Sequence, residues 1–194
     1  MTITLRPYQH EAVEALWGGI KKSRSALCAM STGAGKTECM IAFIQKSIAL
    51  KPDLKVVVLA QKINLIEQTA ERFRKVLGSV SIYCGSIEKD LTGQVVIASI
   101  QSISDVKIEG LNLIVIDEVH AVDHERGRYF DFINLNNHDR LKILGFTATP
   151  YNSRDYIYGE GKLFEKIDYQ KGLDSLIEEG FLVKPLLKKP DHQI

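Results

Sequence analysis

The chain returns several times to short runs of apolar and β-branched residues, and these runs limit its fold more than any other feature. Two of them, KVVVLA and NLIVID, are apolar at successive positions instead of alternating with polar residues. Strands have this pattern when both of their faces are buried, as in a parallel sheet covered on two sides. We expect six such strands, at Ala26–Met30, Lys55–Ala60, Val80–Cys84, Gln94–Ser99, Leu111–Ile116 and Leu141–Phe146.

Segments with helical periodicity separate the apolar runs. We expect helices at Thr37–Ala49, Ile63–Leu77, Arg128–Leu135 and Gly172–Glu179. Alternation of strands and helices predicts an α/β fold with a mostly parallel, doubly wound sheet, which binds ligands beyond the carboxyl ends of its strands. The chain has 194 residues, enough for one large domain. We expect that domain to span 1–183.

The composition excludes several classes of protein. The formal net charge is only +1, so a nucleic-acid partner would have to meet a local basic patch. No apolar run approaches the roughly 20 residues that span a bilayer, and the N-terminus does not have the pattern of a secretory signal. The three cysteines, Cys28, Cys39 and Cys84, have no C-x-x-C spacing, which indicates reduced thiols. We therefore expect a soluble, cytoplasmic protein without membrane contact.

The first expected strand leads into a glycine-rich loop followed by a helix, the setting of a Walker A motif. Gly33 and Gly35 allow successive N–H groups to turn inward and bind phosphate, Lys36 adds a positive charge, and the Thr37 hydroxyl suits Mg²⁺. Met30 occupies the usual leading Gly or Ala position, which is tolerable if its side chain points into the core. The expected ATP contacts of this phosphate loop are Ser31, Thr32, Gly33, Ala34, Gly35, Lys36 and Thr37.

A second motif, DEVH, follows the fifth expected strand. A carboxylate at the tip of a buried strand is the Walker B arrangement, in which Asp117 would hold Mg²⁺. The neighbouring Glu118 would orient and deprotonate the attacking water. A solvated acidic turn is the alternative, but it explains neither the phosphate loop in the same chain nor the D-E-x-H order. The catalytic residues predicted from the sequence are therefore Lys36, Asp117 and Glu118.

These motifs resemble those of superfamily 2 helicases of the DExH type. The phosphate loop is similar to motif I, Asp117–His120 to motif II, Thr147–Thr149 to motif III, and Leu5–Gln9 (LRPYQ) to the Q motif. Two other segments, Leu59–Gln68 and Ser99–Ser102, resemble the family motifs that contact nucleic acid. The likeness extends to RadD-like DNA-repair helicases and their restriction-enzyme and phage relatives, which share the ending L-I-x-x-G-F-L-x-x-P. Leu59–Gln68 departs from the family pattern, because Ala60-Gln61-Lys62 replaces the usual Pro-Thr at its start.

The resemblance implies a RecA-like first motor domain that binds ATP and Mg²⁺, hydrolyses ATP, and acts on nucleic acid, with DNA favoured over RNA. It also implies that residues 184–194 leave the domain toward a second RecA-like domain that supplies arginine fingers. Without that domain, we expect slow turnover. Two other classes remain as alternatives, a P-loop kinase or small-molecule NTPase and a catalytically silent nucleic-acid-binding module. Stimulation of the ATPase activity by nucleic acid would distinguish a motor from a kinase or small-molecule NTPase. Nucleotide binding in a titration would distinguish a motor from a silent nucleic-acid-binding module.

The resemblance also assigns individual roles, each with a plainer alternative. Gln9 would read the adenine edge and Arg6 would lie against the base, although Gln9 after Pro7 also suits a plain helix start. His120 would connect the acidic motif to Thr147 or to the partner domain, or it is a structural histidine. Thr147 and Thr149 would relay the nucleotide state, or they only end a strand before a proline. The candidate nucleic-acid contacts, for each of which a solvated loop group is the plainer alternative, are Gln61, Lys62, Gln101 and Ser102.

Overall fold

The computed structural model describes residues 3–60, 63–123, 126–152 and 155–184. Within these residues a single sheet of eight strands runs in the order β4-β3-β5-β2-β6-β7-β1-β8. Only the pairing of β3 with β4 is antiparallel. The strands are β1 (Ser25–Met30), β2 (Lys55–Ala60), β3 (Val80–Cys84), β4 (Glu88–Lys89), β5 (Val95–Ser99), β6 (Leu111–Asp117), β7 (Lys142–Thr147) and β8 (Tyr169–Lys171).

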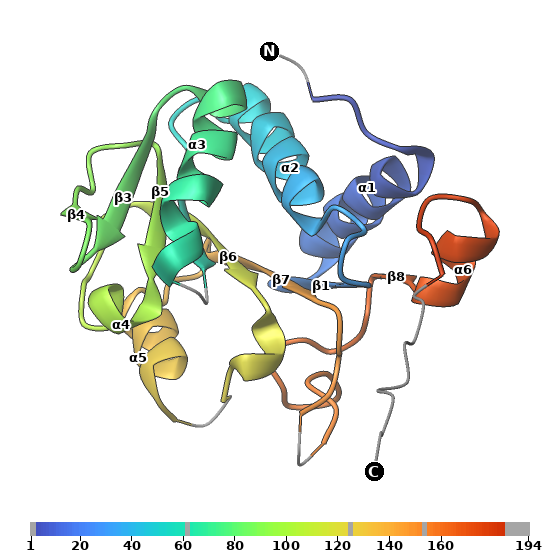
Figure 1. The fold of residues 1–194 in the computed structure, drawn as a ribbon. Helices are drawn as coiled ribbons and strands as arrows, with labels where there is room; N and C mark the ends of the chain where they lie inside the picture. The colour runs from blue at the N-terminus through green and yellow to red at the C-terminus, as the bar shows by residue number, and fades with distance from the viewer. Residues whose placement is uncertain (1–2, 61–62, 124–125, 153–154, 185–194) are drawn as a thin grey trace, which may run out of the picture.

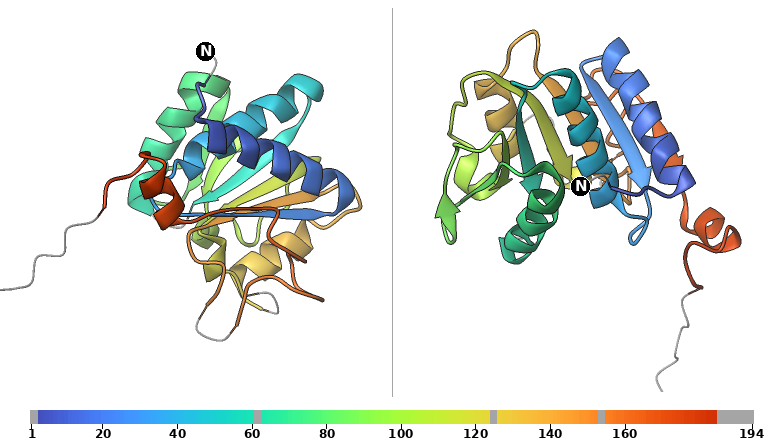
Figure 2. Two further views of the ribbon diagram at one scale, coloured as in Figure 1. Left: turned by 90° about the vertical axis from the view of Figure 1, so that its right-hand side faces the viewer. Right: turned by 90° about the horizontal axis from the view of Figure 1, so that it is seen from above.

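Helices cover both faces of the sheet (Figures 1 and 2). α1 (Pro7–Lys22), α2 (Lys36–Leu50) and α3 (Ile66–Leu77) lie on one face. α4 (Ile100–Ile103), α5 (Arg128–Leu135) and the long connection after β7 lie on the other. The remaining elements are η1 (Ile63–Leu65), η2 (Val119–Ala121) and α6 (Leu173–Glu178). Among the described residues, no helix is long and apolar enough to cross a membrane.

The sheet separates two hydrophobic cores, as expected for strands buried on both faces. Leu16, Phe43 and Phe73 fill the core beneath α1, α2 and α3. Phe132 and Phe164 lie in the core on the opposite face. In β2 every residue after the first is buried, which is why its sequence does not alternate.

The six strands and the helices predicted from periodicity are present, most of them within one residue of the expected bounds. The strand expected at Leu111–Ile116 also includes Asp117, and the helix expected at Ile63–Leu77 divides into η1 and α3. Sequence patterns gave no signal for β4, β8 or α4. These elements have two to four residues, and the two strands are mostly polar because they lie at the edges of the sheet.

The connection after β7 returns to the sheet through two close contacts. Gly145 in β7 leaves room for Phe164, since a Cβ at Gly145 would lie 2.5 Å from the ring. At the start of β8, the Asp168 carboxylate accepts the Leu27 N–H at 3.0 Å, and the Asp168 N–H donates to the Leu27 carbonyl at 2.9 Å. The Asp168 side chain is 6% exposed, and burial raises the pKa of its carboxyl group. Residue 168 thereby attaches β8 to the edge of β1.

We expect Asp168→Ala to lower the free energy of unfolding by about 1–3 kcal/mol, because the buried Leu27 N–H loses its acceptor. Urea denaturation of both chains measures the difference. Asp139→Ala, which removes an exposed carboxylate, serves as the control and should change stability by less than about 0.5 kcal/mol. Equal stability of the two variants would show that the Asp168 side chain does not hold this edge.

Candidate ATP site

The phosphate loop connects β1 to α2 and has the backbone conformation that its glycines predict. Gly33 and Gly35 both have φ of 81°, a left-handed conformation that side chains disfavour. The loop closes on itself through a hydrogen bond from the Ala34 N–H to the Ser31 carbonyl at 3.1 Å. Met30 is fully buried, so its side chain lies beneath the loop in the core as required. Gly35 is the N-cap of α2, so the loop ends at a helix N-terminus, where an anion binds favourably.

Lys36 is the buried cation of the site. Its ammonium donates a hydrogen bond to the Met30 carbonyl at 3.3 Å and lies 3.4 Å from Glu118 Oε1. The side chain is only 9% exposed, so the charge is held in a fixed position at low solvent screening. The ammonium therefore lies between the phosphate loop and the acidic motif, where a terminal phosphate would need a positive charge.

The acidic motif occupies the end of β6, which is separated from β1 by β7. Asp117 is the last residue of the strand, and its Oδ1 accepts the N–H of Glu118 at 3.1 Å. Glu118 has φ of 52°, the only positive φ among the described non-glycine residues. Glu118 therefore starts the turn after β6 in a left-handed conformation that non-glycine residues seldom adopt. Burial raises the pKa of the Asp117 carboxyl group, and the nearby charge of Glu118 raises it further.

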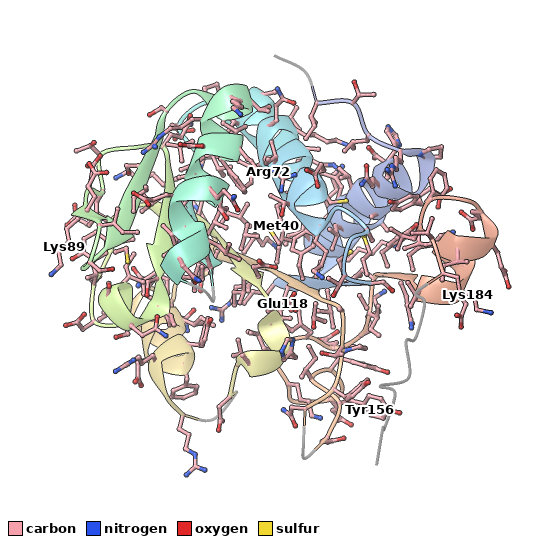
Figure 3. The ribbon with its side chains drawn as sticks, in the orientation of Figure 1. Met40, Arg72, Lys89, Glu118, Tyr156 and Lys184 are labelled. Atoms are coloured by element: carbon pink, nitrogen blue, oxygen red, sulfur yellow. The ribbon has the colours of Figure 1, made fainter. Side chains whose placement is uncertain are left out.

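A cavity of about 230 Å³ opens beside the acidic pair and the start of α2. Figure 3 shows Arg72 on α3, Met40 on α2 and Glu118 after β6 in this part of the molecule. Sequence reasoning did not single out Arg72, which forms an ion pair with Glu38 in the first turn of α2. The cavity is lined by Thr37, Ala60, Leu65, Gln68, Thr69, Arg72, Asp117 and Glu118.

His120 makes the contact with Thr147 that was one of its two expected roles. The His120 Nδ1 atom lies 2.9 Å from the Thr147 hydroxyl and 3.3 Å from Glu118 Oε2. The Thr147 hydroxyl also donates to the Thr149 carbonyl and accepts the Thr149 N–H, both at 3.0 Å. These bonds connect the acidic motif to the Thr147–Thr149 turn at the end of β7.

The LRPYQ segment lies against the phosphate loop. Gln9 is 5% exposed, and its amide donates to the Ala34 carbonyl at 2.9 Å and accepts the Arg6 N–H at 2.9 Å. Tyr8, which sequence reasoning passed over, donates to the same Ala34 carbonyl at 3.0 Å. The Arg6 guanidinium lies over the ring of Phe181. Gln9 therefore starts the helix and supports the loop, with one donor and one lone pair left for a ligand.

The candidate nucleic-acid contacts receive little support from geometry. Gln61 and Lys62 lie outside the described residues. Ser102, on α4, uses its hydroxyl to accept the Gly85 N–H at 2.9 Å. Gln101 accepts a hydrogen bond from the Ser99 hydroxyl. Both residues lie on α4 and not in a loop, and both bond within the domain, while Gln101 is also exposed.

Comparison with known proteins decides the family. The model of the family described as the Type III restriction enzyme res subunit matches residues 2–152, well over half of the chain. The chain belongs to this family. The Methanocaldococcus jannaschii protein MJ1505, described as an ATP-dependent RNA helicase, is 30% identical over 151 residues, covering 69% of this chain and 19% of that protein. The mouse ATP-dependent RNA helicase DHX58 is 27% identical over 173 residues, covering 75% and 25%.

Solved structures show the same fold. The Type ISP restriction-modification enzyme LlaGI, solved in complex with a DNA substrate mimic, matches with a TM-score of 0.75 and 19% identity, covering 92% of this chain and 21% of that one. The Pyrococcus furiosus Hef helicase domain matches with a TM-score of 0.68 and 23% identity, covering 86% and 38%. The chain therefore has the α/β fold of helicase RecA-like domains, as its motifs predicted. It spans a quarter or less of the curated relatives.

If the Gln9 amide reads the adenine edge, as the sequence predicts, Gln9→Ala should reduce the preference of the site for ATP over GTP by about tenfold or more. Tyr8→Phe is the matched control, since it removes the other hydrogen bond to the Ala34 carbonyl and leaves the amide in place. Titrations of both nucleotides measure the effect. If the two variants keep the same preference, Gln9 serves the loop and the helix start alone.

Proposed function

We propose that this family member binds ATP with Mg²⁺ and is the hydrolytic half of a two-domain motor that moves on DNA. The observation that carries the proposal is the position of the Lys36 ammonium, 3.4 Å from Glu118 and beside the phosphate loop. A cation and a carboxylate at this spacing suit a terminal phosphate and the water that attacks it. The protein would work in the cytoplasm, which agrees with its three buried free thiols.

The donor groups at the acidic end of the site fit Mg²⁺. Thr37 and Asp117 line the same cavity, and the burial that raises the Asp117 pKa makes its charged form favour a cation. They would hold the ion, which supplies charge neutralisation of the phosphates when bound. Lys36 would bind the phosphate oxygens directly. Glu118 would accept a proton from the attacking water, and ADP and phosphate would be the products.

The contact of His120 with Thr147 supports a coupling role. Thr147 ends the strand that lies between the phosphate loop and the acidic motif, so a shift of Glu118 against phosphate would reach the Thr147–Thr149 turn through His120. We assign the stabilising arginine fingers to a second RecA-like domain, which would follow residues 184–194. Fingers of this kind contribute about 10³–10⁵ to the rate in P-loop enzymes.

The choice of DNA rests on the resemblance to DNA-repair and restriction helicases and on the LlaGI fold match with a DNA substrate mimic. RNA is the second candidate, because the two curated relatives are described as RNA helicases. ATPase stimulation of the motor by DNA and by RNA of the same sequence separates the two. A P-loop kinase is less consistent with the His120–Thr147 contact, which such chemistry does not require.

We expect Lys36→Ala to weaken ATP binding by about tenfold or more, because a charge-assisted contact to phosphate is lost. Glu118→Gln should instead keep the affinity and slow single-turnover hydrolysis by about a hundredfold or more, since an amide still accepts from Lys36 but cannot take a proton. Both are measured on the 194-residue chain with Mg²⁺. Unchanged ATP affinity in Lys36→Ala, or equal loss of affinity in Glu118→Gln, would contradict these roles.

Nucleic-acid binding by this domain should be weak and dependent on salt, because one motor domain supplies only half of a strand-binding surface. With about three phosphate contacts, a rise from about 50 to about 200 mM salt should lower the affinity for single strands about twentyfold. Fluorescence anisotropy with labelled oligonucleotides of two unrelated sequences provides the test. Tight binding that ignores salt and depends on sequence would indicate a different kind of reader.

A further inference from the structure

The segment that follows α6, residues 180–184, lies beside the phosphate loop. The N–H groups of Phe181 and Leu182 both donate to the Leu176 carbonyl, at 2.8 and 3.0 Å, which fixes the start of the segment against α6. Leu182 lies beside the loop, since a Cβ at Gly33 would be 3.6 Å from its Cδ2 atom. Phe181 meets the ring of Tyr8 edge to face, with the ring centroids 4.9 Å apart. We call residues 180–184 the exit segment.

At the surface beside the loop, the exit segment and the LRPYQ segment place a cation over an aromatic ring. The Arg6 guanidinium lies 5.5 Å from the centroid of Phe181, and its Nη1 donates to the Phe181 carbonyl at 3.3 Å. Arg6 is exposed and Phe181 is half-buried. Both groups have flat faces on which a heteroaromatic ring stacks well. The contact joins residues that are 175 positions apart in the chain.

The strand order determines which end of a nucleotide would reach this pair. The acidic motif ends β6, which lies on one side of β1 beyond β7, and there Thr37 and Asp117 line the cavity suited to the terminal phosphate and its metal. β8 pairs with the opposite edge of β1, and α6 and the exit segment follow it. A nucleotide with its terminal phosphate toward Asp117 therefore has its base on the side of Arg6 and Phe181.

Resting on the proposed ATP-binding function, we propose that Phe181 is a base-contacting residue, whose ring forms one wall of the nucleobase site opposite Arg6. For a flat base to fit between them, the guanidinium and the ring must be about 7 Å apart, because the base contacts each of them at about 3.5 Å. The present separation is 5.5 Å, so Arg6 must move outward by a small distance. That movement breaks its hydrogen bond to the Phe181 carbonyl. Nucleotide binding thereby changes how the exit segment is held.

Comparing a nucleotide with a ligand that has no base tests the proposal. The probes are ADP and inorganic tripolyphosphate, each titrated with Mg²⁺ into the 194-residue chain. Phe181→Leu keeps the apolar bulk against Tyr8 but loses the aromatic face. It should weaken ADP binding about tenfold and leave tripolyphosphate binding unchanged. Phe181→Tyr should restore the affinity for ADP. Tyr151→Leu, which removes a ring that is 56% exposed on the connection after β7, should change neither.

The outcomes separate this inference from the function on which it rests. If Phe181→Leu weakens the binding of ADP and of tripolyphosphate equally, the ring only supports the loop. If it weakens the binding of neither, the ring is not part of the site. A native chain that binds tripolyphosphate as tightly as ADP would overturn the base wall alone. A native chain that binds neither ligand would overturn the proposed ATP site and the base wall together. Hydrogen exchange should also show faster exchange in residues 181–184 when ADP is bound; unchanged exchange there would contradict the release of the exit segment.

Discussion

The pairing of β7 between β1 and β6 is the constraint on which the site depends. In this register Ala29 of β1 is opposite Thr147, and Asp117 of β6 is opposite Phe146. Because all three strands are parallel, their carboxyl ends meet at one edge of the sheet, where ligands bind in such folds. The phosphate loop, the acidic motif and the Thr147–Thr149 turn are thereby brought together, although more than a hundred residues separate the first from the last.

The polar groups at this edge are held by bonds within the protein. Lys36 is oriented by Met30 and Glu118, and the Ala34 carbonyl receives hydrogen bonds from both Tyr8 and Gln9. Such bonds keep buried polar groups from being unsatisfied, and they fix the side chains before a nucleotide arrives. A phosphate would compete with Glu118 for the Lys36 ammonium, which connects nucleotide binding to the carboxylate that His120 also contacts.

The position of Phe181 depends on the other edge of β1. Asp168 attaches β8 there, and α6 and the exit segment follow, so Phe181 reaches Arg6 from the far end of the chain. Two glycines leave room for side chains of the connection between β7 and β8 to pack against the rest of the domain. Gly19 in α1 leaves space for the Asp168 carboxylate, and Gly145 leaves space for Phe164. A side chain at either position would meet atoms closer than 3.0 Å.

The sequence by itself determined the α/β class, the six long strands and the candidate residues of the ATP site, because these depend on local patterns. Runs such as KVVVLA require two buried faces, and the phosphate loop requires glycine at fixed positions. Only the tertiary structure decided which partners the polar side chains take. Ser102 bonds to Gly85, Arg6 lies on Phe181, and β8 is a strand because the edge of β1 is available to it. These outcomes depend on contacts between distant segments, which local periodicity does not encode.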